Sequence, residues 1–135
     1  MRANVSDLRN FKEDALEKGT YEVEVTEAIQ VIANSGSEGL RLTMRIIDGP
    51  DTRLGQPSQG KRISDTLWYP SAQMKDGGTY CGVRLKRACE SANVPLDEDG
   101  TFDIEDWVGA NVGVKVELED YEGVPRAKVA TYVAI

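Results

Sequence analysis

The chain has 135 residues, of which 40% are hydrophobic and 29% charged, and its 16 basic and 23 acidic side chains give a net charge of −7. This size and composition are typical of one globular domain with its own hydrophobic core. No apolar run approaches the ~20 residues of a membrane span, and the N-terminus lacks the apolar stretch of a signal peptide. We therefore expect no membrane association and a cytoplasmic location, or a location in the cytoplasm of a host.

The charge is unevenly distributed along the chain. Residues 1–39 carry a net charge of −4 and residues 91–135 carry −7, whereas residues 40–90 carry +4. A groove can be basic while the whole molecule is acidic, because net charge mainly reports on solubility and non-specific binding. The middle third is therefore the part in which we look for a site that binds a polyanion.

Helical spacing of apolar residues at the start predicts a helix over residues 6–18, ended by Gly19. From Thr20 the apolar period changes to two. This alternation predicts strands at residues 20–32, 40–47 and 61–69, separated by loops rich in Gly, Ser, Pro and Asp.

The second half of the chain predicts a helix and a hairpin. Residues 79–92 are typical of a helix, and an acidic connector with one short turn near residues 104–108 follows. Alternation over residues 112–119 and 126–133 predicts two strands joined by a turn at residues 120–123. Two of the aromatic residues of the chain, Tyr21 and Trp107, are expected in the core.

Three strands, a helix and two strands are the element order of the OB-fold, a five-stranded, partly open barrel. We therefore predict a mainly β protein: an N-terminal helical segment over residues 1–19 and an OB-fold domain over residues 20–135.

Several kinds of chemistry are not indicated by the sequence. The chain has no histidine, which excludes Ser-His and Cys-His nucleophile pairs and makes a zinc site improbable. No phosphate-binding loop motif occurs, and the acidic cluster at residues 97–106 fails the calcium-loop pattern at its first and twelfth positions. Cys81 and Cys89 lie about 12 Å apart on the predicted helix, too far for a disulfide. We therefore expect that the protein is not an enzyme and that it binds neither a metal nor a cofactor.

Binding of single strands without sequence readout needs a positive track for phosphates and exposed aromatic faces for stacking. In OB-folds this surface lies across the second and third strands. The outward positions of these predicted strands, with neighbouring residues of the last hairpin, supply both components. The candidate phosphate contacts are Arg41, Arg45, Lys61, Arg62, Arg126 and Lys128, and the candidate stacking residues are Trp68, Tyr121 and Tyr132.

Each of these assignments has a structural alternative. The arginines at positions 41, 45 and 62 could pair across strands with Glu22, Glu24 or Glu117. Tyr132 could cap the barrel, and Trp68 could be packed. The basic residues of the predicted helix at positions 84, 86 and 87 are most simply its solvated side.

Short segments of the chain resemble the OB-fold single-stranded-DNA-binding proteins of phages, a family long classified as a domain of unknown function. The segments occur in the same order as in that family. The matching segments are 18–23 (KGTYEV), 37–42 (SEGLRL), 106–109 (DWVG) and 116–129 (VELEDYEGVPRAKV). The resemblance covers about residues 18–133. It implies a replication or recombination protein that coats single-stranded DNA made during phage growth.

We therefore predict non-catalytic, sequence-tolerant binding and protection of single-stranded DNA during phage replication or recombination. Partner proteins of replication or recombination and self-association would be compatible with this role. The alternative is an OB-fold interaction module that docks on a replication, recombination or virion protein, for which the acidic segments 1–39 and 91–135 would be suited.

Overall fold

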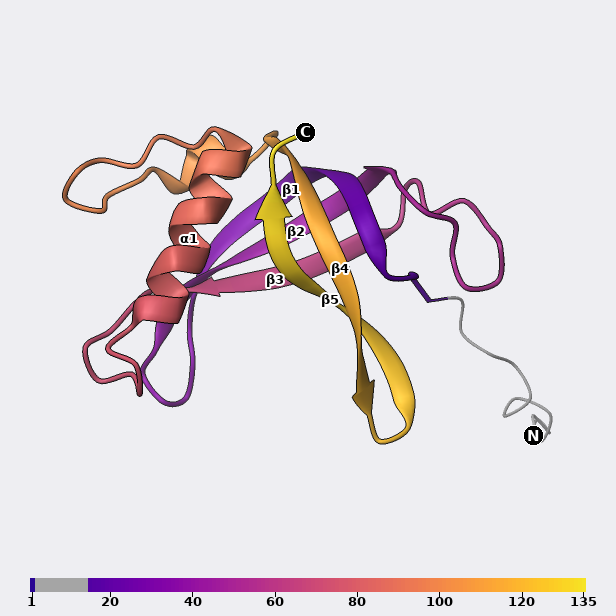
Figure 1. Ribbon diagram of the computed structural model, residues 1–135, viewed down its shortest axis with the longest axis horizontal. Helices are drawn as coiled ribbons and strands as arrows, with labels where there is room; N and C mark the ends of the chain where they lie inside the picture. The colour runs from indigo at the N-terminus through magenta and orange to yellow at the C-terminus, as the bar shows by residue number, and fades with distance from the viewer. Residues whose placement is uncertain (2–14) are drawn as a thin grey trace.

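A computed structural model describes Met1 and residues 15–135. Five antiparallel strands form one sheet in the order β3-β2-β1-β4-β5, and the sheet is not closed (Figure 1). The strands are β1 (Gly19–Ile32), β2 (Glu38–Asp48), β3 (Arg62–Trp68), β4 (Asn111–Tyr121) and β5 (Val124–Val133). An α-helix, α1 (Thr79–Ala92), and a 3₁₀ turn, η2 (Ile104–Trp107), connect β3 to β4. The mainly β class and the predicted element order of residues 20–135 are confirmed.

The sheet curls around the apolar residues that alternate along its strands. The central strand β1 pairs with β2 on one side and with β4 on the other, and the two outer strands, β3 and β5, contact each other without forming a ladder. The helix α1 packs against β3, β4 and β5 (Figure 1). The largest fully buried side chains are Tyr21, Leu40, Leu42, Met44, Ile46, Leu67, Trp107 and Tyr132. The expected core positions of Tyr21 and Trp107 are therefore confirmed.

The predicted helix over residues 6–18 lies mainly outside the described residues. Its last residues, 15–18, are described and are not helical, so the prediction is wrong there. Their groups bond to other parts of the fold instead. The Ala15 carbonyl accepts from the Arg53 N–H at 2.9 Å, and the Glu17 carbonyl accepts from the Tyr21 hydroxyl at 2.6 Å. Leu16 is buried, so this segment is packed against the core just before β1 begins.

The β4–β5 hairpin differs from the prediction at its turn. Tyr121 pairs with Val124, which leaves only Glu122 and Gly123 in the loop. Both have positive φ, at 52° and 80°, the backbone geometry of a two-residue type I′ turn. The residues at positions 120 and 121, expected in the turn, are therefore the last residues of β4.

A bulge in β5 changes which side chains face the core. Lys115 pairs with Thr131 and Val116 pairs with Val129, so Ala130 is an extra residue without a partner on β4. An extra residue shifts the alternation by one position. Val129 and Tyr132 are consequently both buried, although strict alternation would place them on opposite faces.

Candidate nucleic-acid interface

The outward face of β2 and β3 carries three exposed arginines. Arg41 lies opposite Thr66 in the ladder, and Arg45 lies directly opposite Arg62. Side chains directly opposite each other in an antiparallel pair have Cβ atoms about 5 Å apart, and like charges at such positions destabilise the sheet. The fold therefore holds two cations together, and of the two only Arg45 has a carboxylate partner among the described residues, Glu24 at 3.5 Å, so a bound anion would offset the remaining repulsion.

Trp68 continues this outward face at the end of β3. Its ladder partner is Gly39, and a Cβ atom at that glycine would lie 2.8 Å from Trp68 Cε3 and 2.9 Å from the Leu67 carbonyl oxygen. The glycine leaves room for the indole ring to lie against β2. Trp68 is half-buried, so it is neither a core residue nor a fully exposed one.

The ion pairs on this surface are few and exposed. Arg45 lies 3.5 Å from Glu24, and Lys128 lies 3.6 Å from Glu119. Exposed pairs of this kind contribute only about 0–1 kcal/mol, so phosphate can compete for these cations. Arg41, Arg62 and Lys61 form no ion pair with any residue that the structure describes. Of the expected cross-strand pairs, only the Arg45–Glu24 pair forms among the described side chains.

The structure brings Lys128 of β5 close to Trp68 of β3. Both line one groove of about 480 Å³, the seam groove, which lies between the edges of β3 and β5 beside the first turns of α1. Lys61 is half-buried immediately before β3, and Arg126 is exposed further along β5 toward the hairpin turn. The side chain of Tyr121 lies outside what the structure describes.

Tyr132 is not on this surface. Its side chain is 1% exposed, and its hydroxyl donates a hydrogen bond to Asp65 Oδ2 at 2.6 Å. The bulge at Ala130 turns the ring inward, so the prediction that Tyr132 offers an exposed stacking face is wrong.

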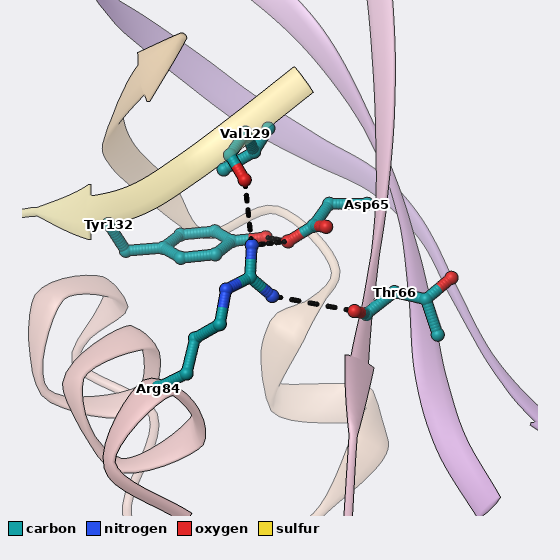
Figure 2. A network of polar contacts seen from close by, with 5 residues as sticks. All are labelled: Asp65, Thr66, Arg84, Val129 and Tyr132. Carbon is teal, nitrogen blue, oxygen red and sulfur yellow. Dashed lines mark hydrogen bonds and ion pairs between the residues drawn. The ribbon is translucent and has the colours of Figure 1, made fainter. Parts of the chain in front are cut away.

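Asp65 and Tyr132 belong to a buried network with Arg84 of α1 (Figure 2). The Arg84 guanidinium donates to Asp65 Oδ2 at 2.8 Å, to the Val129 carbonyl at 2.9 Å and to the Thr66 carbonyl at 3.4 Å. It also lies over the Tyr132 ring, 5.7 Å from the ring centroid. One side chain thus bonds to the backbone of both β3 and β5, the two strands that do not pair.

The environment of Tyr132 raises the pKa of its phenol well above the usual 10. Burial is the largest cause, followed by the charge of Asp65 and the hydrogen bond to it, while the charge of Arg84 acts in the opposite direction. The phenol therefore remains protonated and acts as a hydrogen-bond donor at neutral pH.

The sequence analysis missed this network. It treated Arg84 as part of a solvated helix side, whereas the Arg84 side chain is only 16% exposed. The available signal was Asp65, which shares a face of β3 with Ile63 and Leu67. A carboxylate at a core-facing strand position needs a buried partner.

Among the described residues, no three acidic or cysteine side chains form a group that could hold a metal ion, and Cys81 and Cys89 are both free. No helix in residues 15–135 is long and apolar enough to cross a bilayer.

The chain belongs to a protein family described as a protein of unknown function, DUF669, whose model matches residues 2–132. The match covers both the sheet and the helix. No curated protein matches the chain.

Proposed function

We propose that this protein is an OB-fold single-stranded-DNA-binding protein that coats DNA exposed during replication or recombination, in a phage setting. The strand order supports the fold assignment: β1 pairs with both β2 and β4, β3 approaches β5, and the helix lies between β3 and β4 in the chain. This is the arrangement expected of a partly open five-stranded barrel.

The observation that carries the functional proposal is the juxtaposition of Arg45 and Arg62, with Arg41 two outward positions away along β2. Folding alone does not favour two guanidinium groups directly opposite each other. A phosphate backbone that crosses β2 and β3 would neutralise them, and the Trp68 ring at the end of the same face would stack on a base.

The test is fluorescence anisotropy of a labelled oligo-dT of about 30 nucleotides at ~50 and ~200 mM salt, with a duplex of the same length as control. We expect tighter binding to the single strand and a marked loss of affinity at the higher salt. Trp68→Ala should weaken binding roughly tenfold through lost stacking. Lys115→Thr, which removes one exposed charge from β4, is the control for a substitution elsewhere on the sheet and should change the affinity less than Trp68→Ala. Absence of binding at ~50 mM salt and micromolar protein would refute the proposal.

A second candidate function is a protein-interaction module. A mainly apolar groove of about 550 Å³ lies between α1 and the connector before η2 and is lined by Tyr69, Leu85, Leu96, Phe102 and Ile104 among others. Exposed acidic residues of the connector flank it. If oligonucleotides of every kind fail to bind, pull-down with Phe102→Asp as the negative control tests this alternative.

A further inference from the structure

The seam groove contains a second aromatic ring that the sequence analysis did not assign to the DNA surface. Tyr80, in the first turn of α1, lines the groove together with Trp68 and is 68% exposed. The two rings make no ring contact with each other or with another described aromatic side chain. The groove that both rings line has a volume of about 480 Å³, which is room for a planar ligand.

The position of Tyr80 is fixed by its backbone and not by packing of its ring. Asp76 Oδ2 accepts a hydrogen bond from the Tyr80 N–H at 2.8 Å, and Asp76 Oδ1 accepts one from the Gly78 N–H at 2.9 Å. These bonds hold the start of the helix and lower the pKa of Asp76. The ring is 68% exposed and contributes little to the core, so its face is accessible to a ligand in the groove.

The charges that face the groove balance. Arg84 and Asp65 pair at its inner side at 2.8 Å, and Lys128 and Glu117 lie on its β5 and β4 side. Two cations thus face two carboxylates. A phosphate would gain no net attraction here, whereas it would gain one from the arginines of β2 and β3. A groove that combines two aromatic rings with zero net charge suits a neutral, planar group.

The backbone edges of the groove offer polar groups to such a ligand. β3 and β5 are the unpaired outer strands of the sheet, so their inward edges lack ladder partners. Arg84 occupies the carbonyls of Thr66 and Val129. In an antiparallel strand every second residue directs its N–H and C=O to the same side, so the backbone groups of Trp68 face the seam as those of Thr66 do.

We propose that the seam groove binds one nucleobase of the single strand, turned out of the stack and held against Trp68 and Tyr80, while the phosphates on either side follow the arginines of β2 and β3. This inference rests on the proposed function and adds a distinct site for a base. Arg84 has a positioning role, since it holds the two strand edges at a fixed separation.

The test compares Tyr80→Ala, Tyr80→Phe and the control Val83→Ala for binding to oligo-dT at several salt concentrations. Val83 is exposed on the same helix and does not line the groove. We expect Tyr80→Ala to weaken binding roughly tenfold, and Tyr80→Phe and Val83→Ala to stay close to the wild type. The salt slope reports counterions released by phosphate contacts, and stacking releases none. The slope of log K against log salt should therefore be the same in Tyr80→Ala as in the wild type.

Cys81 provides an independent readout in the wild-type protein. It lines the same groove, and the other cysteine, Cys89, is buried. Saturating oligo-dT should slow the reaction of Cys81 with a maleimide several-fold, and an equal concentration of duplex should not.

The outcomes separate this inference from the proposed function. If the wild type binds oligo-dT but Tyr80→Ala binds equally well, or if bound oligo-dT leaves the rate at Cys81 unchanged, the base site is wrong and the proposed function stands. A weaker affinity with a shallower salt slope in Tyr80→Ala would also overturn the base site, because it would indicate a phosphate contact. If the wild type binds no single strand, the proposed function fails first.

Discussion

The Tyr132 hydroxyl donates a hydrogen bond of 2.6 Å to Asp65, which joins β5 to β3 although these strands form no ladder with each other. Arg84 reinforces the junction from α1 through bonds to the same carboxylate and to one carbonyl on each strand. Side chains therefore replace the backbone ladder that would close a complete barrel. The resulting gap between the strand edges is the seam groove.

Removal of Arg84 should be strongly destabilising. Arg84→Met leaves the Asp65 carboxylate, whose side chain is only 14% exposed, without its cation, and loss of one partner of a buried pair costs about 3–5 kcal/mol. We expect a decrease of roughly 3 kcal/mol in the free energy of unfolding, measured by urea denaturation. Arg87→Met, at an exposed position of the same helix, is the control. A decrease below ~1 kcal/mol for Arg84→Met would show that the network is not structural.

Tyr132→Phe should be destabilising in a pH-dependent manner. The substitution removes a hydrogen bond to a charged group, worth about 1.5–3 kcal/mol. Because burial and Asp65 raise the folded-state pKa of the phenol, its contribution is fully present below the unfolded pKa of about 10 and is lost as the pH rises toward the folded value.

The measurement is the free energy of unfolding of both proteins between about pH 7 and 11. The difference between wild type and Tyr132→Phe should be constant at neutral pH and should shrink above about pH 10. Tyr80→Phe, which removes the hydroxyl of an exposed tyrosine, is the control for the substitution itself and should change the free energy of unfolding at neutral pH little. If the free energies of unfolding of wild type and Tyr132→Phe differ by the same amount at all pH values, the buried environment of Tyr132 beside Asp65 is contradicted.

Arg62→Thr should stabilise the protein and weaken its binding to DNA. Removal of the repulsion between Arg62 and Arg45 should raise the free energy of unfolding by about 0.2–1 kcal/mol. If one phosphate contact is lost, the slope of log K against log salt for oligo-dT should fall by about 0.7. Lys115→Thr is the control, because it also removes one positive charge from an exposed strand position, but the residues opposite Lys115 are Thr20 and Thr131. If Arg62→Thr lowers the stability and leaves the affinity for oligo-dT unchanged, Arg45 and Arg62 do not form a phosphate-binding pair.

Gly39→Ala should disturb both the sheet and Trp68. The added Cβ would lie 2.9 Å from the Leu67 carbonyl oxygen, a backbone atom that cannot move independently, and 2.8 Å from the indole ring. We expect a loss of about 1–3 kcal/mol and a shift in tryptophan fluorescence. Gly82→Ala in α1 is a control of opposite sign. Its Cβ would meet only Pro70 at 3.7 Å, and helix propensity favours alanine by up to ~1 kcal/mol. If Gly39→Ala and Gly82→Ala change the free energy of unfolding by similar amounts, the close approach of Gly39 to Leu67 and Trp68 is contradicted.

Only Cys81 should react in the native protein. Burial raises the pKa of Cys89 to about 11, with a smaller effect of Glu90, so very little Cys89 thiolate exists near neutral pH. An aromatic disulfide reagent at about pH 8 should titrate one thiol rapidly in the native protein and two in urea. Rapid reaction of two thiols without denaturant would show that Cys89 is accessible.

The local pattern of the sequence was sufficient for most of the secondary structure. Strict alternation placed β1, β2, β3 and β4 within two residues of their observed ends, and helical spacing gave the bounds of α1 correctly. The same alternation predicted the outward direction of Arg41, Arg45 and Arg62. These features depend on side chains that are neighbours along one element, and that information is contained in the sequence.

The bulge at Ala130 and the network around Asp65 depend on contacts between segments far apart in the chain. No local signal marks Ala130 as the residue that has no partner, and the inward turn of Tyr132 follows from it. Likewise, whether Arg84 is solvated or buried is decided by the closeness of β3 and β5, because only there do two carbonyls and a carboxylate surround it. The sequence by itself determined the strands, the faces of β1, β2, β3 and β4, and the basic residues on the outward face of β2 and β3. The tertiary structure alone decided which polar groups close the seam and which aromatic residues remain exposed beside it, because burial depends on packing between distant parts of the chain.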